Sequence, residues 1–500
     1  MSEPKHAARS VTAIRTESPP PHRWGILGLV GVAQLMVILD TTIVNIALPS
    51  AQHDLGFSTD NRQWVVTAYA LAFGSLLLLG GRLSDLFGQR ITLVVGLLGF
   101  AVVSAVGGAA GGFEMLVAAR ALQGVFAAIL APAALSTLNV TFTDARERAR
   151  AFGVYTAVAG GGGVIGLMLG GVLTEWLSWR WCLYVNLIFA IPTAIGVLAW
   201  IRGTSGNRRV RIDVAGVLTG SGGLFCLVYG LSNAQLDGWG NSLTVIMLVA
   251  AAALLAAFVA VETRVSQPLL PLRIVADRNR GGALLTIVTA SCSFFAAFLF
   301  LTYFFQVNLG YSPLRTGVSF LPLIGGLMVA VALSNLVFLP RFGPRPMVPT
   351  GMLIAAGAMW WLAQLSVDST YADGVLGPMI VLGLGIGTSL APSITTATAG
   401  IDAADAGVGS AMVNTSQQVG GAIGAAALSA VFANALADYV RDHRPSSPRA
   451  AAALQQAASI HGYSAAFTVS ACVFLAGAIA LALLLRSGRV TPTEGVAVGV

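Results

Sequence analysis

Charged residues are scarce in this chain of 500 residues. They make up 10% of the sequence, whereas hydrophobic residues make up 56%, and the mean hydropathy is +0.80. Soluble globular proteins carry about 25% charged residues, so the apolar excess of this chain has to face lipid. The composition therefore predicts an integral membrane protein.

Residues that bind metals and nucleotides are also few. Five histidines are scattered, and the four cysteines lie far apart in apolar runs, which excludes a disulfide framework and favours a packing role. The only lysine is Lys5, so the chain lacks the phosphate-binding loop of an ATP-driven pump. We expect no metal and no cofactor. The cysteines are Cys182, Cys226, Cys292 and Cys472.

Long apolar stretches recur along the whole sequence. A helix needs about 20 apolar residues to cross the roughly 30 Å hydrocarbon core of a bilayer. Fourteen stretches meet this requirement, which predicts an all-α fold with fourteen transmembrane helices. They lie near 25–48, 62–80, 91–111, 114–138, 151–174, 181–201, 214–233, 243–261, 281–307, 316–339, 347–366, 375–397, 407–434 and 464–486.

Basic residues fall mainly on one side of this predicted topology. With the N-terminus in the cytoplasm, 21 of the 28 Lys and Arg residues lie on the cytoplasmic side, 6 lie on the other side, and Arg120 lies inside a span. Cytoplasmic loops of membrane proteins carry such an excess. The pattern predicts a multi-pass protein of the cell membrane with both termini cytoplasmic. It also explains the net charge of +7 without a nucleic-acid partner.

The N-terminal segment does not resemble a secretory signal peptide. Its first 23 residues are polar, include Pro19–Pro21 and lack the apolar core that a signal peptide needs. We predict a disordered cytoplasmic tail at 1–23, with a second cytoplasmic tail at 487–500.

Short segments repeat at long range, which indicates an internal duplication. Leu130–Pro132 recurs 260 residues later, Gly162–Gly166 recurs 258 residues later, and Gly88 matches Gly343 at an offset of 255. The offsets join corresponding helices of two six-helix units, an established plan of transporters with a midplane substrate site. They predict an N-terminal bundle at 24–201, two inserted helices with linkers at 202–280, and a C-terminal bundle at 281–486.

Four segments carry a resemblance to a known family. Residues 39–49 read LDTTIVNIALP, 81–90 read GRLSDLFGQR, 120–124 read RALQG, and 162–171 read GGVIGLMLGG before Trp179-Arg180-Trp181 and Asn186. Together they resemble the major facilitator superfamily, specifically its fourteen-helix drug:proton antiporters. The resemblance implies export of hydrophobic or amphiphilic drugs, antibiotics or dyes in exchange for protons, by alternating access.

Two positions depart from the family motifs. Leu167 stands where the antiporter motif usually has proline, and Gln89 stands where a basic residue is common. A proton-coupled importer or facilitator of a small metabolite stays open as an alternative. Rivals of other classes are a membrane-embedded enzyme, for which no constellation of acids or histidines is found, and a transporter-like receptor or sensor.

Two ionised side chains lie well inside predicted spans. Asp40 is expected about 12 Å, and Arg120 about 9 Å, from the outer helix ends at 1.5 Å per residue. Charges at such depth are costly unless they pair or line a wet cavity. One interpretation is a structural ion pair, or Asp40 capping a kink near Pro49. The other makes Asp40 the proton carrier, with Arg120 as its switch or as part of the substrate pocket.

Further candidates come from the matching motifs. By resemblance, the loop with Gly81, Arg82, Asp85, Gly88 and Arg90 is a latch that locks the cytoplasmic side in the outward-open state, although an ordinary positively charged loop would look similar. Small residues allow helices to approach closely and slide. The glycines of the fifth span are therefore candidates for packing or for a hinge, and they are Gly162, Gly163, Gly166, Gly170 and Gly171.

Polar and aromatic residues within spans are the candidates for contacting substrate. We name Asn45, Gln123, Tyr303 and Gln417, although most aromatic residues near Tyr303 are expected to pack against lipid or core. The expected partners are a small-molecule substrate, protons and membrane lipids, and the protein is expected to be monomeric.

Overall fold

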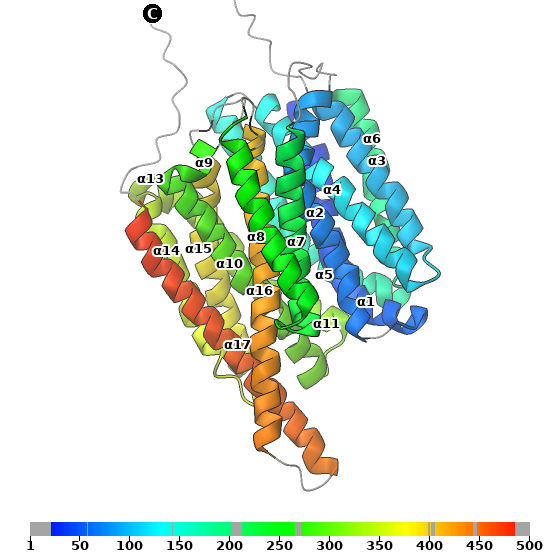
Figure 1. Cartoon of the computed structure of the whole chain (residues 1–500), viewed down its shortest axis with the longest axis vertical. Coiled ribbons are helices and arrows are strands. Elements are labelled where there is room, and N and C mark those ends of the chain that lie inside the picture. Colours follow the sequence, from blue (N-terminus) through cyan, green and yellow to red (C-terminus); the bar gives the residue numbers. More distant parts are fainter. Residues whose placement is uncertain are drawn as a thin grey trace, which may run out of the picture.

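The computed structural model describes residues 22–57, 59–142, 144–201, 213–265, 268, 270, 272–398, 401, 406–443 and 448–485, and all the regular structure in these ranges is helical. The predicted tails at 1–23 and 487–500 lie almost wholly outside the described residues, as does the basic segment 202–212. Most long helices run roughly along the longest axis of the molecule (Figure 1). They form the predicted all-α architecture.

The first six helices contain the first six predicted spans. Extensive packing joins α1 to α5, α2 to α4 and α3 to both α4 and α6. The helices are α1 (Arg23–Leu55), α2 (Thr59–Phe87), α3 (Gln89–Gly108), α4 (Phe113–Thr141), α5 (Ala145–Trp176) and α6 (Trp181–Trp200).

Helices α7 (Val214–Asp237) and α8 (Ser242–Glu262) follow as a hairpin. Helix α7 packs against both α2 and α16, so it lies along the boundary between the two halves of the chain. The rings of Trp64 on α2 and Tyr229 on α7 are 5.4 Å apart. Helix α8 packs mainly on α7, in front of the bundle in Figure 1.

The second half contains the remaining six predicted spans. Several of these spans are divided, with short π-helical turns at η1, η2 and η3. The elements are α9 (Leu272–Ala276), α10 (Arg278–Tyr303), η1 (Phe304–Asn308), α11 (Pro313–Ser319), α12 (Leu321–Leu333), η2 (Ser334–Phe338), α13 (Leu339–Phe342), α14 (Pro344–Leu362), η3 (Tyr371–Leu376), α15 (Gly377–Thr398), α16 (Ala406–Asp442) and α17 (Pro448–Leu484).

Helices of the structure cover all fourteen predicted spans. In the described part of the chain, eleven helices are long and apolar enough to cross a membrane. Helices α16 and α17 are longer than predicted, at 37 residues each, because the expected loop at 435–463 is largely helical. At 1.5 Å per residue each is about 55 Å long, well beyond a bilayer core. Their joined ends project past the other helices (Figure 1).

The two halves share packing details, as the repeat in the sequence predicts. Gly88 and Gly343 precede corresponding helices with φ of +83° and +73°, a backbone conformation that favours glycine. Gly166 faces Thr42 of α1, and its counterpart Gly424 faces Cys292 of α10. The α1–α5 pair therefore corresponds to the α10–α16 pair.

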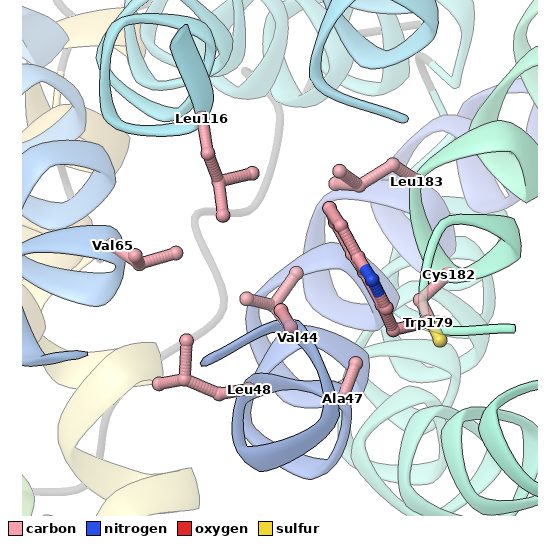
Figure 2. Close-up of a pocket in the computed structure, with 9 residues that line it drawn as sticks. Val44, Ala47, Leu48, Val65, Leu116, Trp179, Cys182 and Leu183 are labelled. Carbon is pink, nitrogen blue, oxygen red and sulfur yellow. The ribbon is translucent and has the colours of Figure 1, made fainter. Parts of the chain in front are cut away.

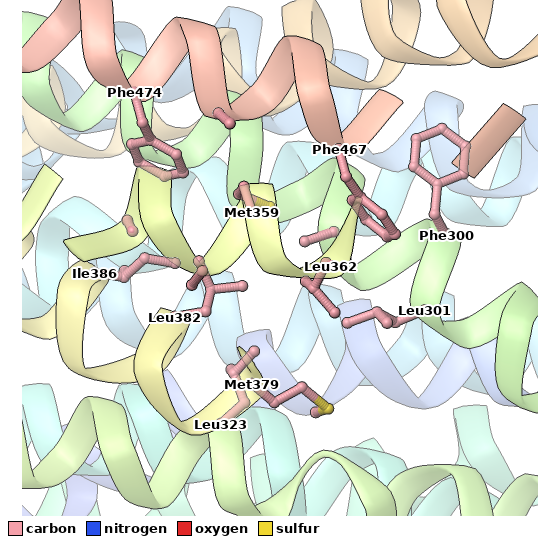
Figure 3. Close-up of a cluster of buried hydrophobic side chains, with 14 of the residues drawn as sticks. Phe300, Leu301, Leu323, Met359, Leu362, Met379, Leu382, Ile386, Phe467 and Phe474 are labelled. Atoms are coloured by element: carbon pink, nitrogen blue, oxygen red, sulfur yellow. The ribbon is translucent and has the colours of Figure 1, made fainter. Parts of the chain in front are cut away.

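Each half has its own buried core. In the second half, aromatic and aliphatic side chains from α10, α12, α14, α15 and α17 interlock (Figure 3). Lipid is as apolar as these side chains, so helix association there depends on close van der Waals packing. The core of the second half also includes Ile46 and Leu167 of the first half, so the two bundles pack against each other.

Candidate functional site

The two intramembrane charges predicted from the sequence form a buried ion pair. Arg120 Nη1 of α4 lies 2.5 Å from Asp40 Oδ2 of α1, and the two side chains are 1% and 0% exposed. Helix α1 continues through Pro49 to Leu55, so Asp40 lies about 22 Å from its end rather than the expected 12 Å. The expectation failed because the proline did not end the helix.

Amide side chains complete the coordination of Asp40. Its Oδ1 accepts hydrogen bonds from Gln123 Nε2 at 3.0 Å and from Asn186 Nδ2 at 2.9 Å. Both amides also donate to Ser104 Oγ, at 2.7 and 3.3 Å respectively. We call Asp40, Arg120, Gln123, Asn186 and Ser104 the Asp40 network. It links α1, α3, α4 and α6.

Arg120 is held by more than its ion pair. Its Nε donates to the backbone carbonyl of Val65 on α2 at 3.1 Å, and its Nη1 donates to Gln123 Oε1 at 2.9 Å. Its guanidinium carbon lies 4.5 Å from the centre of the Tyr69 ring, within cation–π range. Helix α2 is thereby connected to the charge on α4.

The Asp40 network is built for an ionised carboxylate. All three hydrogen-bond partners of Asp40 are donors, and an ionised carboxylate is acceptor-only. Protonation of Asp40 would remove the negative charge that strengthens these contacts. The site can therefore hold an arginine and a carboxylate in contact inside the span.

Two members of the network were not identified from the sequence as parts of the site. Asn186 is an amide side chain in an otherwise apolar helix, a pattern that could have indicated a functional role. It also lies in one of the segments that resemble the family motifs, but no role was assigned to it. Ser104 gave no signal, because hydroxyl residues are common in membrane helices. Gln123 was expected to contact substrate, but it is 0% exposed and bonded to Asp40.

An apolar pocket adjoins the Asp40 network. Side chains from α1, α2, α4 and α6, and from the turn before α6, converge on one space (Figure 2). Each lining residue is at most 6% exposed, so the walls of this space are buried within the bundle. The residues are Val44, Ala47, Leu48, Ala51, Val65, Leu116, Trp179, Cys182 and Leu183.

The motif loop between α2 and α3 contacts two other segments. Arg82 donates to the backbone carbonyl of Pro268, beyond α8, and Arg90 Nη2 donates to the carbonyl of Leu198 on α6 at 2.6 Å. The Arg90 contact holds the loop within its own bundle. Nearby, the expected latch residue Gly81 faces Pro132. The side chain of the remaining latch residue, Asp85, lies outside the described residues.

The predicted glycines of α5 pack closely against two neighbouring helices. Gly162, Gly166 and Gly170 leave no free room for a side chain beside α1, whereas Gly163 leaves ordinary van der Waals space. Gly171 instead meets the backbone of Leu314 on α11. This stripe therefore brings α5 against both halves of the protein.

Leu167 lies at the position where the antiporter motif, which this segment resembles, usually has proline. The side chain is 1% exposed and belongs to the same buried cluster as residues of the second half. A Cβ on Gly317 of α11 would lie 3.2 Å from Leu167 Cβ. The substitution thus supplies a packing contact between the halves.

The remaining substrate candidates lie on three different helices, α1, α10 and α16. Asn45 donates to the backbone carbonyl of Thr41 on its own helix at 3.1 Å, and Tyr303 is 40% exposed on α10. Gln417 is partly buried on α16.

Comparisons with known proteins agree with this architecture. Residues 30–425 match the family model of the Major Facilitator Superfamily. The chain is 47% identical over 487 residues to the puromycin resistance protein pur8 of Streptomyces alboniger, covering 97% of this chain and 96% of that protein. It is 40% identical over 407 residues to the cephamycin export protein CmcT of Amycolatopsis lactamdurans, covering 80% and 83% respectively.

A solved structure is similar in fold. The crystal structure of the human organic anion transporter MFSD10 aligns with a TM-score of 0.62, covering 92% of this chain and all of that chain. The sequences are 13% identical, so this likeness concerns the fold alone.

Proposed function

The chain belongs to the Major Facilitator Superfamily, and from that premise we propose that it exports amphiphilic antibiotics or related drugs across the cell membrane in exchange for protons. The protein is a multi-pass membrane transporter. In this proposal both termini are cytoplasmic, the functional unit is one chain, and no cofactor takes part.

The relatives support the substrate class. One is named for resistance to puromycin and another for export of cephamycin, and the first aligns over almost its full length. The two names refer to different compounds, so they favour export of an antibiotic without identifying which one. Apolar residues dominate the spans of this chain, which suits an amphiphilic substrate.

The Asp40 network is the observation that carries the proposal of proton coupling. Among the described residues the buried carboxylates are Asp40 and Glu262, and Glu262 is the last residue of α8. Asp40 alone lies deep within a span, where it pairs with an arginine. Intramembrane ionisable groups of this kind mark proton relays in transporters.

In the proposed cycle, proton binding and the Arg120 contacts exclude one another. Protonation of Asp40 removes the charge that holds Arg120 Nη1 at 2.5 Å and places a donor among donors. Because Arg120 also contacts α2 through the Val65 carbonyl, its release changes the packing of α2 and α4 together. Loss of the proton restores the pair and reverses the change.

Two further elements are proposed to convert this change into alternating access. The motif loop acts as a cytoplasmic latch through Arg82, which reaches the linker near Pro268 between α8 and α9. The glycine stripe of α5 acts as the sliding surface between the halves, where Gly171 meets Leu314. Rocking of one bundle against the other exposes a midplane site to either side.

Reconstitution in liposomes tests the proposal. Asp40→Asn keeps size and hydrogen-bonding capacity but cannot bind the transported proton. We expect the variant to fold and to bind puromycin as a probe, yet to lose accumulation of the drug driven by an imposed pH gradient.

Undiminished gradient-driven transport by Asp40→Asn would remove Asp40 as the carrier. The control is Asp442→Asn, which alters an acid that is 70% exposed at the end of α16. This control is expected to retain gradient-driven transport.

A further inference from the structure

We infer that the apolar pocket next to the Asp40 network is the gate through which protons from the outer side reach Asp40. This inference rests on the proposed proton coupling and adds the route that the proton takes. The route runs inside the first bundle, separately from the drug. The outer side is the side on which α1 ends.

Helical register places the pocket on the outer side of the network. On α1, Val44 lies one turn after Asp40. On α4, which runs in the opposite direction, Leu116 lies one turn before Arg120. Both pocket residues are therefore displaced toward the same side, by about 6 Å at 1.5 Å per residue.

The other two helices repeat this register. On α6, Cys182 lies one turn before Asn186, and on α2, Val65 lies one turn before Tyr69. Four helices thus present polar groups at one level and apolar pocket residues at the next level outward. A proton that comes from the outer side along the interior of this bundle has to cross the apolar level.

The apolar level acts as a barrier while it is closed. Its lining consists of aliphatic side chains together with one indole and one thiol, and none is more than 6% exposed. Cavities with apolar walls stay dry, and hydrophobic constrictions gate conduction by dewetting. Protons need water or polar groups to cross, so Asp40 is insulated from the outer side in this conformation.

Trp179 and Arg180 form a hydrogen-bonded lid at the outer end of the pocket. The Trp179 indole lines the space, and its Nε1 donates to Asp54 Oδ2 at 3.0 Å. Arg180 donates to the same oxygen at 3.0 Å and to the carbonyls of Gly108 and Ala110 at 3.0 and 2.7 Å. These contacts fasten the lid to the outer ends of α1 and α3.

Two buried polar atoms that can bind water lie on the inner side of the barrier. The hydroxyl of Tyr69 and Oδ1 of Asn186 are buried and have no hydrogen-bond partner among the described residues. Buried water typically settles on such groups, so both atoms can anchor water once the pocket wets.

The surroundings of Asp40 indicate that protons from the outer side approach it through this pocket. Arg120, Tyr69 and Cys182 are the charged or titratable side chains beside Asp40 and along the pocket, and Asp54 and Arg180 lie at its outer end. Helices α3 and α6 contribute the uncharged Ser104 and Asn186. The lining residues that the structure describes come from α1, α2, α4, α6 and the turn before α6, as Figure 2 shows. Among these described lining residues none belongs to the second half of the chain, which separates this route from a drug site between the halves.

Making the barrier polar tests the inference. Leu116→Ser places a hydroxyl in the pocket, and Val44→Thr does so without change of size. In sealed proteoliposomes without drug, with a pH-sensitive dye inside, either variant should collapse an imposed pH gradient about tenfold faster than the unaltered protein, because a wetted constriction conducts. The matched control is Leu122→Ser, also on α4 but 50% exposed, which should leave the rate unchanged.

A second variant assigns the leak to Asp40. Leu116→Ser combined with Asp40→Asn should return the gradient collapse to the rate of the unaltered protein. A leak that persists in the double variant would mean that protons bypass Asp40 and would overturn the inference. Wild-type rates for both Leu116→Ser and Val44→Thr would overturn it as well.

The native thiol of Cys182 reports wetting without any transport. With Cys226, Cys292 and Cys472 replaced by serine, a membrane-impermeant methanethiosulfonate added outside should modify Cys182 slowly. Leu116→Ser or Trp179→Ala should speed the modification about tenfold, since water and reagent then reach the pocket. Equal rates in all three proteins would contradict the proposed gate.

The outcomes separate the gate from the coupling. Gradient-driven transport that survives Asp40→Asn rejects the proposed carrier, whatever the pocket does. Loss of such transport in Asp40→Asn, together with unchanged leak and labelling in the pocket variants, rejects the gate alone.

Discussion

Removing both partners of the buried ion pair should lower the free energy of unfolding by far less than the sum of the two single replacements. Arg120→Met removes the cation and leaves the Asp40 carboxyl buried among Gln123 and Asn186 without a partner charge. Loss of one partner from a buried pair costs about 3–5 kcal/mol of stability. Asp40→Asn leaves Arg120 without its counterion and should be destabilising for the same reason.

The double variant is the informative one. With Asp40→Asn and Arg120→Met together, no charge remains at the site, and the amide that replaces the carboxylate still accepts from Gln123 or Asn186. We expect a total cost of about 3–5 kcal/mol, well short of the roughly 6–10 kcal/mol that additivity requires. The double variant should nevertheless be inactive in gradient-driven transport, since it lacks the proton carrier.

Unfolding in mixed micelles with increasing dodecyl sulfate, followed by circular dichroism, measures these free energies. Arg264→Met, at an exposed position after α8, is the control and should change stability by less than about 0.5 kcal/mol. Additive losses in the double variant would refute the reasoning, because they would show that Asp40 and Arg120 contribute independently.

Two further predictions concern topology and helix packing. In sealed cells, a membrane-impermeant maleimide added outside should label Gly240→Cys, in the α7–α8 turn, but not Arg264→Cys; labelling of position 264 would invert the predicted orientation. Gly166→Ala should lose about 1–3 kcal/mol of stability because its Cβ would collide with Thr42 Oγ1, whereas Gly163→Ala should be tolerated with 4.0 Å to Thr42 Cγ2. Thermal unfolding of this matched pair checks the contrast, and equal stability would show that α5 shifts freely away from α1.

The sequence alone determined the features that depend on local energetics. The lengths of apolar runs predict where helices cross the membrane, and all fourteen predicted spans are helical. The cost of burying a lone charge made Asp40 and Arg120 each other's expected partners, and the structure places them in contact. Matching segments predicted the correspondence of the two halves, and the matched Gly88 and Gly343 both have positive φ.

Tertiary structure decided which faces of the helices meet. Asn186 and Ser104 join the Asp40 network because α6 packs against α1 and α3 packs against α4. Tyr303, by contrast, is 40% exposed on its helix. Apolar side chains facing lipid and facing a pocket look alike in a sequence, since both environments are equally apolar. The closed pocket around Val44 and Leu116 therefore emerges only from the packing of four helices, each contributing residues one turn away from its own polar group.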